Sequence, residues 1–180
     1  MKILVGLGNY GEEYVGTRHN IGRDFLIWFA KKNKFSEFKN DSFLKALISE
    51  GEYNNIKYIF VLPQTYMNLS GETVQKIFKK WSDVKAEDVL IIHDDIDINF
   101  GEIKVSTDKG HGGHNGIKSI LNVTGQNLKR VRIGICPKTF FGGFKKPNKE
   151  QVANFVLKKF GLMERGEVEN VYKKVGALFK

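Results

Sequence analysis

The side chains best suited to acid–base chemistry lie near the N-terminus and in the middle of the chain. His19 belongs to the polar run TRHN (17–20), which follows a glycine-rich segment, and Asp94 and Asp95 follow an apolar run. A carboxylate bonded to one imidazole nitrogen fixes the histidine tautomer, so the other nitrogen can take a proton from water. Such a base speeds hydrolysis by roughly 10²–10⁴-fold. These residue types favour a His–Asp hydrolytic site.

Three asparagines lie in predicted loops at element boundaries, at positions 9, 68 and 115. A neutral amide there can donate to a carbonyl or a developing oxyanion without adding charge. Turn formation alone accounts for most loop asparagines. Asn9, Asn68 and Asn115 are therefore candidate substrate contacts only if the fold brings them to His19.

The N-terminal glycines also raise the alternative of nucleotide binding. Gly6, Gly8 and Gly11 match the pattern G-x-G-x-x-G after a predicted strand. That fingerprint needs a helix that starts within the motif and an acidic residue about twenty residues further on. Here Glu12 and Glu13 follow instead, and the later region is a predicted helix that ends in lysines. An NAD-dependent oxidoreductase thus has weak support.

Other reactive side chains form no complete site. The spacing of His111 and His114 invites a zinc assignment, but both lie in a glycine-rich loop, and no cysteine pair completes a ligand set. Local hydrogen bonding or substrate contact is the better interpretation. Cys136 resembles a small core residue, and no G-x-S-x-G motif presents a serine nucleophile. We expect no metal and no cofactor.

Hydrophobic patterning predicts the elements that position these groups. Short apolar runs predict strands, and apolar residues at helical spacing predict helices between them. The predicted strands cover 3–5, 46–49, 57–62, 89–92, 103–106 and 131–135. This alternation predicts a single α/β domain over residues 1–180, a three-layer α/β/α sandwich with a mixed, mostly parallel, twisted sheet. Because strand ends on one edge converge, Asp94 can reach His19.

Three other segments have distinct predictions. Residues 31–45 are polar and lysine-rich, which predicts an irregular connection. Residues 137–149 are basic, aromatic and rich in glycine and proline, which predicts a mobile surface loop. Residues 150–180 predict C-terminal helices.

Bulk composition limits the class of protein. The chain has 180 residues, is 41% hydrophobic and carries a formal net charge of +9, which suggests a polyanionic partner. It has no apolar run long enough for a membrane span, and no signal-peptide pattern. The single cysteine fits a reducing cytoplasm.

Six sequence blocks occur in order along nearly the whole chain. They are GLGNYGEEYVGTRHNIG, PQTYMNLSG, IIHDDIDI, GHGGHNGIKSI, RVRIGI and NFVLKKF. Each block alone is modest, but the set resembles the bacterial-type peptidyl-tRNA hydrolases. The sequence departs from that family's pattern at Tyr10, Phe100 and Ser106, and the last of these leaves the residues that clamp the 5′ phosphate unassigned.

The resemblance implies a monomeric, cytoplasmic carboxylic ester hydrolase that needs no metal or cofactor. It would cleave the ester between a peptide and the tRNA 3′ end, which recycles tRNA for translation. By motif, His19 would be the general base, Asp94 would hold it, and Asn9 would contact the carbonyl. The other matched positions would line the cleft for the peptide and the tRNA end: Tyr14, Tyr66, Asn68, Asn115, Met67, His114 and Arg132.

Two further expectations concern RNA. Basic side chains would contact the tRNA backbone: Lys104, Lys109, Lys118, Arg132 and the lysines of 137–149. A protein of the same fold that binds RNA without hydrolysing it is the alternative function, and the intact His19, Asp94 and Asn9 argue against it.

Overall fold

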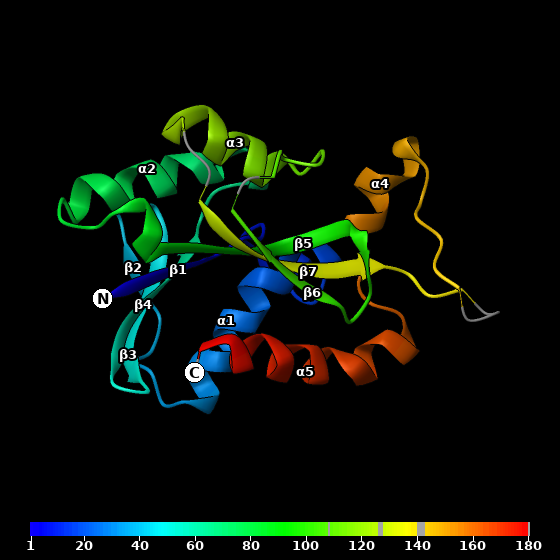
Figure 1. Cartoon of the computed structure of the whole chain (residues 1–180), viewed down its shortest axis with the longest axis horizontal. Helices are drawn as coiled ribbons and strands as arrows, with labels where there is room; N and C mark the ends of the chain where they lie inside the picture. Colours follow the sequence, from blue (N-terminus) through cyan, green and yellow to red (C-terminus); the bar gives the residue numbers. More distant parts are fainter. Residues whose placement is uncertain (108, 126–127, 140–142, 180) are drawn as a thin grey trace.

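A mixed β-sheet lies in the middle of the protein, with helices on both faces (Figure 1). The computed structural model describes residues 1–107, 109–125, 128–139 and 143–179. The strands are β1 (Lys2–Gly6), β2 (Lys39–Asp41), β3 (Ala46–Tyr53), β4 (Ile56–Pro63), β5 (Val89–Asn99), β6 (Ile103–Ser106) and β7 (Lys129–Cys136). The helices are α1 (Ile21–Lys32), α2 (Ser70–Lys80), α3 (Asn115–Thr124), α4 (Lys149–Val156) and α5 (Leu162–Gly176).

Among the described residues the sheet has seven strands in the order β2-β3-β4-β1-β5-β7-β6. The central strands β4, β1, β5 and β7 pair in parallel, while the pairings at both edges are antiparallel. Helices α2 and α3 cover one face, α1 and α5 cover the other, and α4 lies beyond the end of β5 (Figure 1). The predicted three-layer α/β/α fold is confirmed, with parallel pairing confined to the centre.

Strand alternation sends side chains into two separate cores. On β1, Ile3 and Val5 join the buried cluster beneath α2 and α3, whereas Leu4 joins the cluster beneath α1 and α5. On β5, Ile91 faces α2 and α3, and Ile92 faces α1. Because side chains alternate along a strand, Asp94 lies on the same face as Ile92, where α1 begins.

Two sequence predictions about the strands are wrong. β5 does not end at residue 92 but continues to Asn99, because β7 still pairs with it after its other neighbour, β1, has ended at Gly6. The segment 31–45 is not wholly irregular, since it contains the short edge strand β2. The predicted mobile loop at 137–149 lies partly outside the described residues. No helix in the described part of the chain is long and apolar enough to cross a membrane.

Helix α1 approaches β5 unusually closely at Gly22. A Cβ atom built on Gly22 would lie 2.1 Å from the carbonyl oxygen of Ile92, which is backbone and cannot rotate away. The backbone N–H of Arg23 donates to the carbonyl of Leu7 at 3.0 Å, which fixes the same end of α1 over β1. This contact sets the position of His19, which lies three residues before Gly22.

We expect Gly22→Ala to lower the free energy of unfolding by about 2–4 kcal/mol, because the added methyl must displace α1 from the sheet. Gly166→Ala is the matched control, since Gly166 lies at an exposed position of α5 with nothing within 4 Å of its built Cβ. The control should gain about 0.5–1 kcal/mol from improved helix propensity. Urea denaturation measures both, and equal stability of the two variants would contradict the close contact.

Candidate active site

The loop that carries His19 is held by a pair of asparagines. The backbone N–H of Asn9 donates to Oδ1 of Asn20 at 2.9 Å, and Nδ2 of Asn20 donates back to the carbonyl of Asn9 at 2.9 Å. Asn20 is 1% exposed, so both bonds are shielded from water. The glycine-rich turn after β1 and the 3₁₀ turn Arg18–Asn20 are therefore fixed to each other.

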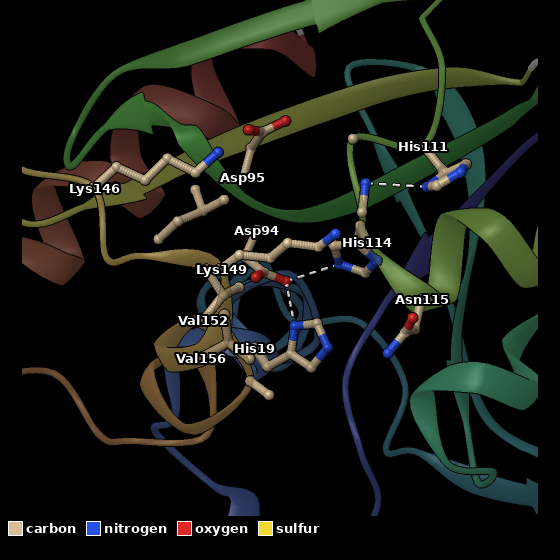
Figure 2. A pocket seen from close by; sticks show the side chains of 14 residues that line it. His19, Asp94, Asp95, His111, His114, Asn115, Lys146, Lys149, Val152 and Val156 are labelled. Carbon is tan, nitrogen blue, oxygen red and sulfur yellow. Dashed lines mark hydrogen bonds and ion pairs between the residues drawn. The ribbon is translucent and has the colours of Figure 1, made fainter.

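His19 and Asp94 meet at the edge of the parallel strands. Nδ1 of His19 lies 2.8 Å from Oδ1 of Asp94, and the two residues are 8% and 2% exposed. Oδ1 of Asp94 is also 2.9 Å from Nε2 of His114, which precedes α3 (Figure 2). The contact predicted between His19 and Asp94 is present, and one carboxylate oxygen joins both imidazoles.

The charges in this cluster determine where the protons lie. Burial alone would raise the pKa of Asp94, but His19 and His114 hold that pKa well below its usual range, so the carboxyl is ionised. An ionised carboxylate only accepts hydrogen bonds, so Nδ1 of His19 must carry a hydrogen. In the neutral ring Nε2 then holds a lone pair, and in Figure 2 it points away from Asp94, toward the side of Asn115. His19 is thus oriented as a proton acceptor.

Asn9, whose backbone Asn20 ties to the His19 loop, has a side-chain amide held by Met67. Its Oδ1 accepts the backbone N–H of Met67 at 2.8 Å, and Asn9 is 7% exposed. That bond fixes which side of the amide carries the oxygen. The amide nitrogen Nδ2 makes no hydrogen bond with another described residue, so its N–H groups are available to a ligand. Asn20, which holds Asn9, was not among the predicted site residues; the sequence signal for it was its place directly after His19.

A cavity of about 550 Å³ opens beside the His19–Asp94 pair. One wall is apolar and comes from α4, with Val152, Ala153 and Val156. Lys146 and Lys149 also line the cavity (Figure 2). A space of this size is typical of small-ligand sites.

Arg18 joins the α4 wall to the His19 loop. Its guanidinium Nη1 donates to the carbonyls of Lys158 and Lys159 at 3.2 and 2.9 Å, and its Nη2 pairs with Glu164 at 2.5 Å. The same group lies 4.3 Å from the ring centroid of Phe155 on α4. Arg18 is 7% exposed, so this is a buried anchor that sequence reasoning did not single out.

The other predicted substrate contacts are distributed around this centre. Asn115 is the first residue of α3 and lines the cavity. Tyr66 packs on Tyr10, with ring centroids 5.1 Å apart, and both rings are exposed. The side chains of Tyr14 and Asn68 make no hydrogen bond with another described residue, so the structure does not tie them to His19.

The basic side chains predicted to contact tRNA differ in whether they already form ion pairs within the protein. Nε of Arg132 is 2.8 Å from Asp95, so this guanidinium is already paired. Lys146 pairs with Asp97. Lys104 and Lys118 are exposed on β6 and α3, where they make no ion pair with another described residue.

The donor set of the cluster could also suit a metal ion. His19, Asp94 and His114 are the one such group among the described residues, with ligand-type atoms all within 4.8 Å of one another. In the structure both imidazoles instead approach a single carboxylate oxygen, which requires a proton on each contacting nitrogen. A metal ion bound by these nitrogens would have to replace both protons.

Comparison with known proteins identifies the family. The family model described as peptidyl-tRNA hydrolase matches residues 3–180. The chain belongs to the peptidyl-tRNA hydrolase family. The peptidyl-tRNA hydrolase of Aliarcobacter butzleri is 42% identical over 173 residues, which are 96% of this chain and 87% of the relative. That of Rickettsia bellii (strain RML369-C) is 41% identical over 175 residues, with 97% and 89% covered.

A solved member of the peptidyl-tRNA hydrolase family has the same fold. The crystal structure of the enzyme from Acinetobacter baumannii matches with a TM-score of 0.84 at 36% identity, over 96% of this chain and 83% of that one. The predictions of the family, of the α/β fold and of a hydrolase acting on peptidyl-tRNA are confirmed. These matches favour the enzyme over the non-catalytic RNA-binding alternative.

Proposed function

We propose that this chain hydrolyses the ester between a peptide and the 3′ end of tRNA, with His19 as the general base. The observation that carries this assignment is the 2.8 Å contact between Nδ1 of His19 and the buried carboxylate of Asp94. That contact leaves Nε2 of His19 as the proton acceptor at the edge of the cavity. An ester is activated enough that a positioned water and an amide-lined oxyanion site suffice.

In the proposed reaction His19 takes a proton from the attacking water and later returns it to the leaving oxygen. Nε2 takes a proton from water as the water oxygen attacks the ester carbonyl, and Asp94 stabilises the imidazolium that forms. Nδ2 of Asn9 donates to the oxyanion, because its Oδ1 is held by Met67. The bond from the carbonyl carbon to the ribose oxygen breaks, and the imidazolium returns the proton to that oxygen. The products are a free tRNA end and the peptide carboxylic acid, which then releases its proton to solvent water.

We extend the proposal to the setting of the reaction. The net charge of +9 suits contacts with tRNA phosphates, with exposed Lys104 and Lys118 as candidates. The path of the peptide and the tRNA end would be lined by Asn115, Tyr66, Met67, Tyr14 and Asn68. We propose that the enzyme acts as a cytoplasmic, single-domain monomer and uses no metal.

The test of substrate class compares N-acetylated aminoacyl-tRNA with the same aminoacyl-tRNA left unblocked. We expect the blocked ester to be cleaved at least about tenfold faster, because a free α-ammonium adds a charge beside a site of neutral amides. Asn9→Asp is the informative variant, since its carboxylate can still accept the N–H of Met67 but offers no donor to the oxyanion. It should lose most of the activity on the blocked ester. A wild-type protein that binds tRNA and cleaves neither ester would overturn the proposal.

A further inference from the structure

Both ring nitrogens of His114 are used inside the protein. Nδ1 accepts the backbone N–H groups of Gly116 and Ile117, at 3.1 and 3.3 Å, as the N-cap of α3. Nε2 lies 2.9 Å from Oδ1 of Asp94. The side chain of His114 is only 9% exposed. Sequence reasoning placed His114 among the substrate contacts, but these bonds tie it to α3 and to Asp94.

The helix end fixes the tautomer of His114. A nitrogen that accepts two N–H groups must keep its lone pair, so Nδ1 carries no hydrogen. Nε2 must then carry the hydrogen, and it donates that hydrogen to Asp94. His114 is thus an uncharged donor, unlike His19, whose task is to become charged.

We propose that His114 is a positioning residue, which α3 holds as the uncharged Nε2–H tautomer so that it fixes the carboxylate of Asp94 and shares its charge with His19. This inference rests on the proposed role of His19 as the base. Two donors on one oxygen restrict rotation of the carboxylate and keep that oxygen within hydrogen-bonding distance of His19. The hydrogen bond from His114 partly offsets the negative charge on the Asp94 oxygen, so that oxygen stabilises the protonated form of His19 less strongly. His114 therefore limits how readily His19 is protonated.

The neighbouring groups are compatible with this assignment. His93 contacts His114 edge to face, with centroids 4.8 Å apart, and burial holds the pKa of His93 well below its usual value, so it adds no charge. Arg18 directly precedes His19 in the loop, and its positive charge is paired with the carboxylate of Glu164. The other charged or titratable residues that line the cavity are Asp95, His111, Lys146 and Lys149. All of these groups are the same in the wild type and in the His114 variants described below. A difference in activity or pH profile between those proteins is therefore due to residue 114.

Two substitutions separate the structural role from the chemical one. In His114→Asn the shorter amide still caps α3, because asparagine is a strong N-cap, but it is too short to keep the bond to Asp94. His114→Ala loses both contacts. We expect His114→Asn to have the higher unfolding midpoint of the two, while both lose about tenfold in kcat at unchanged KM. In both, the acidic limb of the kcat/KM profile should move to higher pH.

The direction of that shift distinguishes charge sharing from simple loss of structure. A raised KM with unchanged kcat would overturn the proposal, because His114 would then contact substrate. An acidic limb that stays in place or moves to lower pH would overturn the charge-sharing role.

Nitrogen NMR of the imidazoles gives a readout independent of turnover. At about pH 8, where an ordinary histidine is neutral, His114 should show hydrogen on Nε2 and a lone pair on Nδ1. Hydrogen on Nδ1 would overturn the proposal. If the wild type cleaves no peptidyl-tRNA ester, the proposed function fails, while this spectrum still decides the tautomer of His114.

Discussion

Replacing His19 with glutamine is expected to lower kcat for N-acetylated aminoacyl-tRNA by about 10²–10⁴-fold, because the substitution removes the proposed proton acceptor. Glutamine is chosen because its amide can still donate to Asp94, so the buried carboxylate keeps a partner. Binding of tRNA should be unchanged, because phosphate contacts come from basic side chains elsewhere. Single-turnover kinetics measures the first quantity, and fluorescence anisotropy measures the second.

The matched control for this substitution is His111→Gln. His111 lines the same cavity but is exposed, and its Nδ1 accepts only the backbone N–H of Gly113, at 3.0 Å, among the described residues. The control should keep nearly wild-type kcat. If His19→Gln turned over as fast as this control, His19 would not be the base.

The second large effect is expected from Asp94→Asn, with a fall in kcat of about 10³–10⁴-fold. The asparagine amide can donate to Nδ1 of His19, which would put the hydrogen on Nε2, the nitrogen that must accept a proton. The imidazolium also loses its charge partner, so the acidic limb of the pH profile should move to lower pH. This direction is opposite to that expected for the His114 variants.

Asp88→Asn is the control for the loss of a carboxylate beside β5. Asp88 directly precedes that strand at its far end and pairs with Lys2 at 2.8 Å on the surface, where such pairs contribute little. Its kcat and pH profile should match the wild type. A pH profile of Asp94→Asn that coincided with that of Asp88→Asn would mean that Asp94 does not act on His19.

The sequence was sufficient to predict the layers and the central pair of the site. The continuous apolar runs of β1 and β5 indicate that both faces of the sheet are buried, and two buried faces need helices on both sides. The convergence of strand ends predicted the contact of Asp94 with His19. The length of β5 could not be predicted, because residues 93–95 are polar and their strand conformation is maintained by pairing with β7.

The residues that support the site were harder to predict because their partners are distant in sequence. Arg18 contacts carbonyls 140 and 141 residues away, and no local pattern reports such an anchor. Asn20 resembles an ordinary loop asparagine until its two bonds to Asn9 are seen. His114 reads as a glycine-loop histidine, and only the fold shows that α3 and Asp94 use its two nitrogens.

The most direct test of the account is the pH dependence of the single-turnover rate constant on N-acetylated aminoacyl-tRNA, with an NMR titration of the His19 imidazole in the same buffer. If His19 is the base, the rate should rise with pH and level off, with a midpoint that coincides with the titration of His19, because only the neutral ring can take the proton. A rate that is independent of pH, or that follows a group other than His19, would contradict the role of His19 as the base.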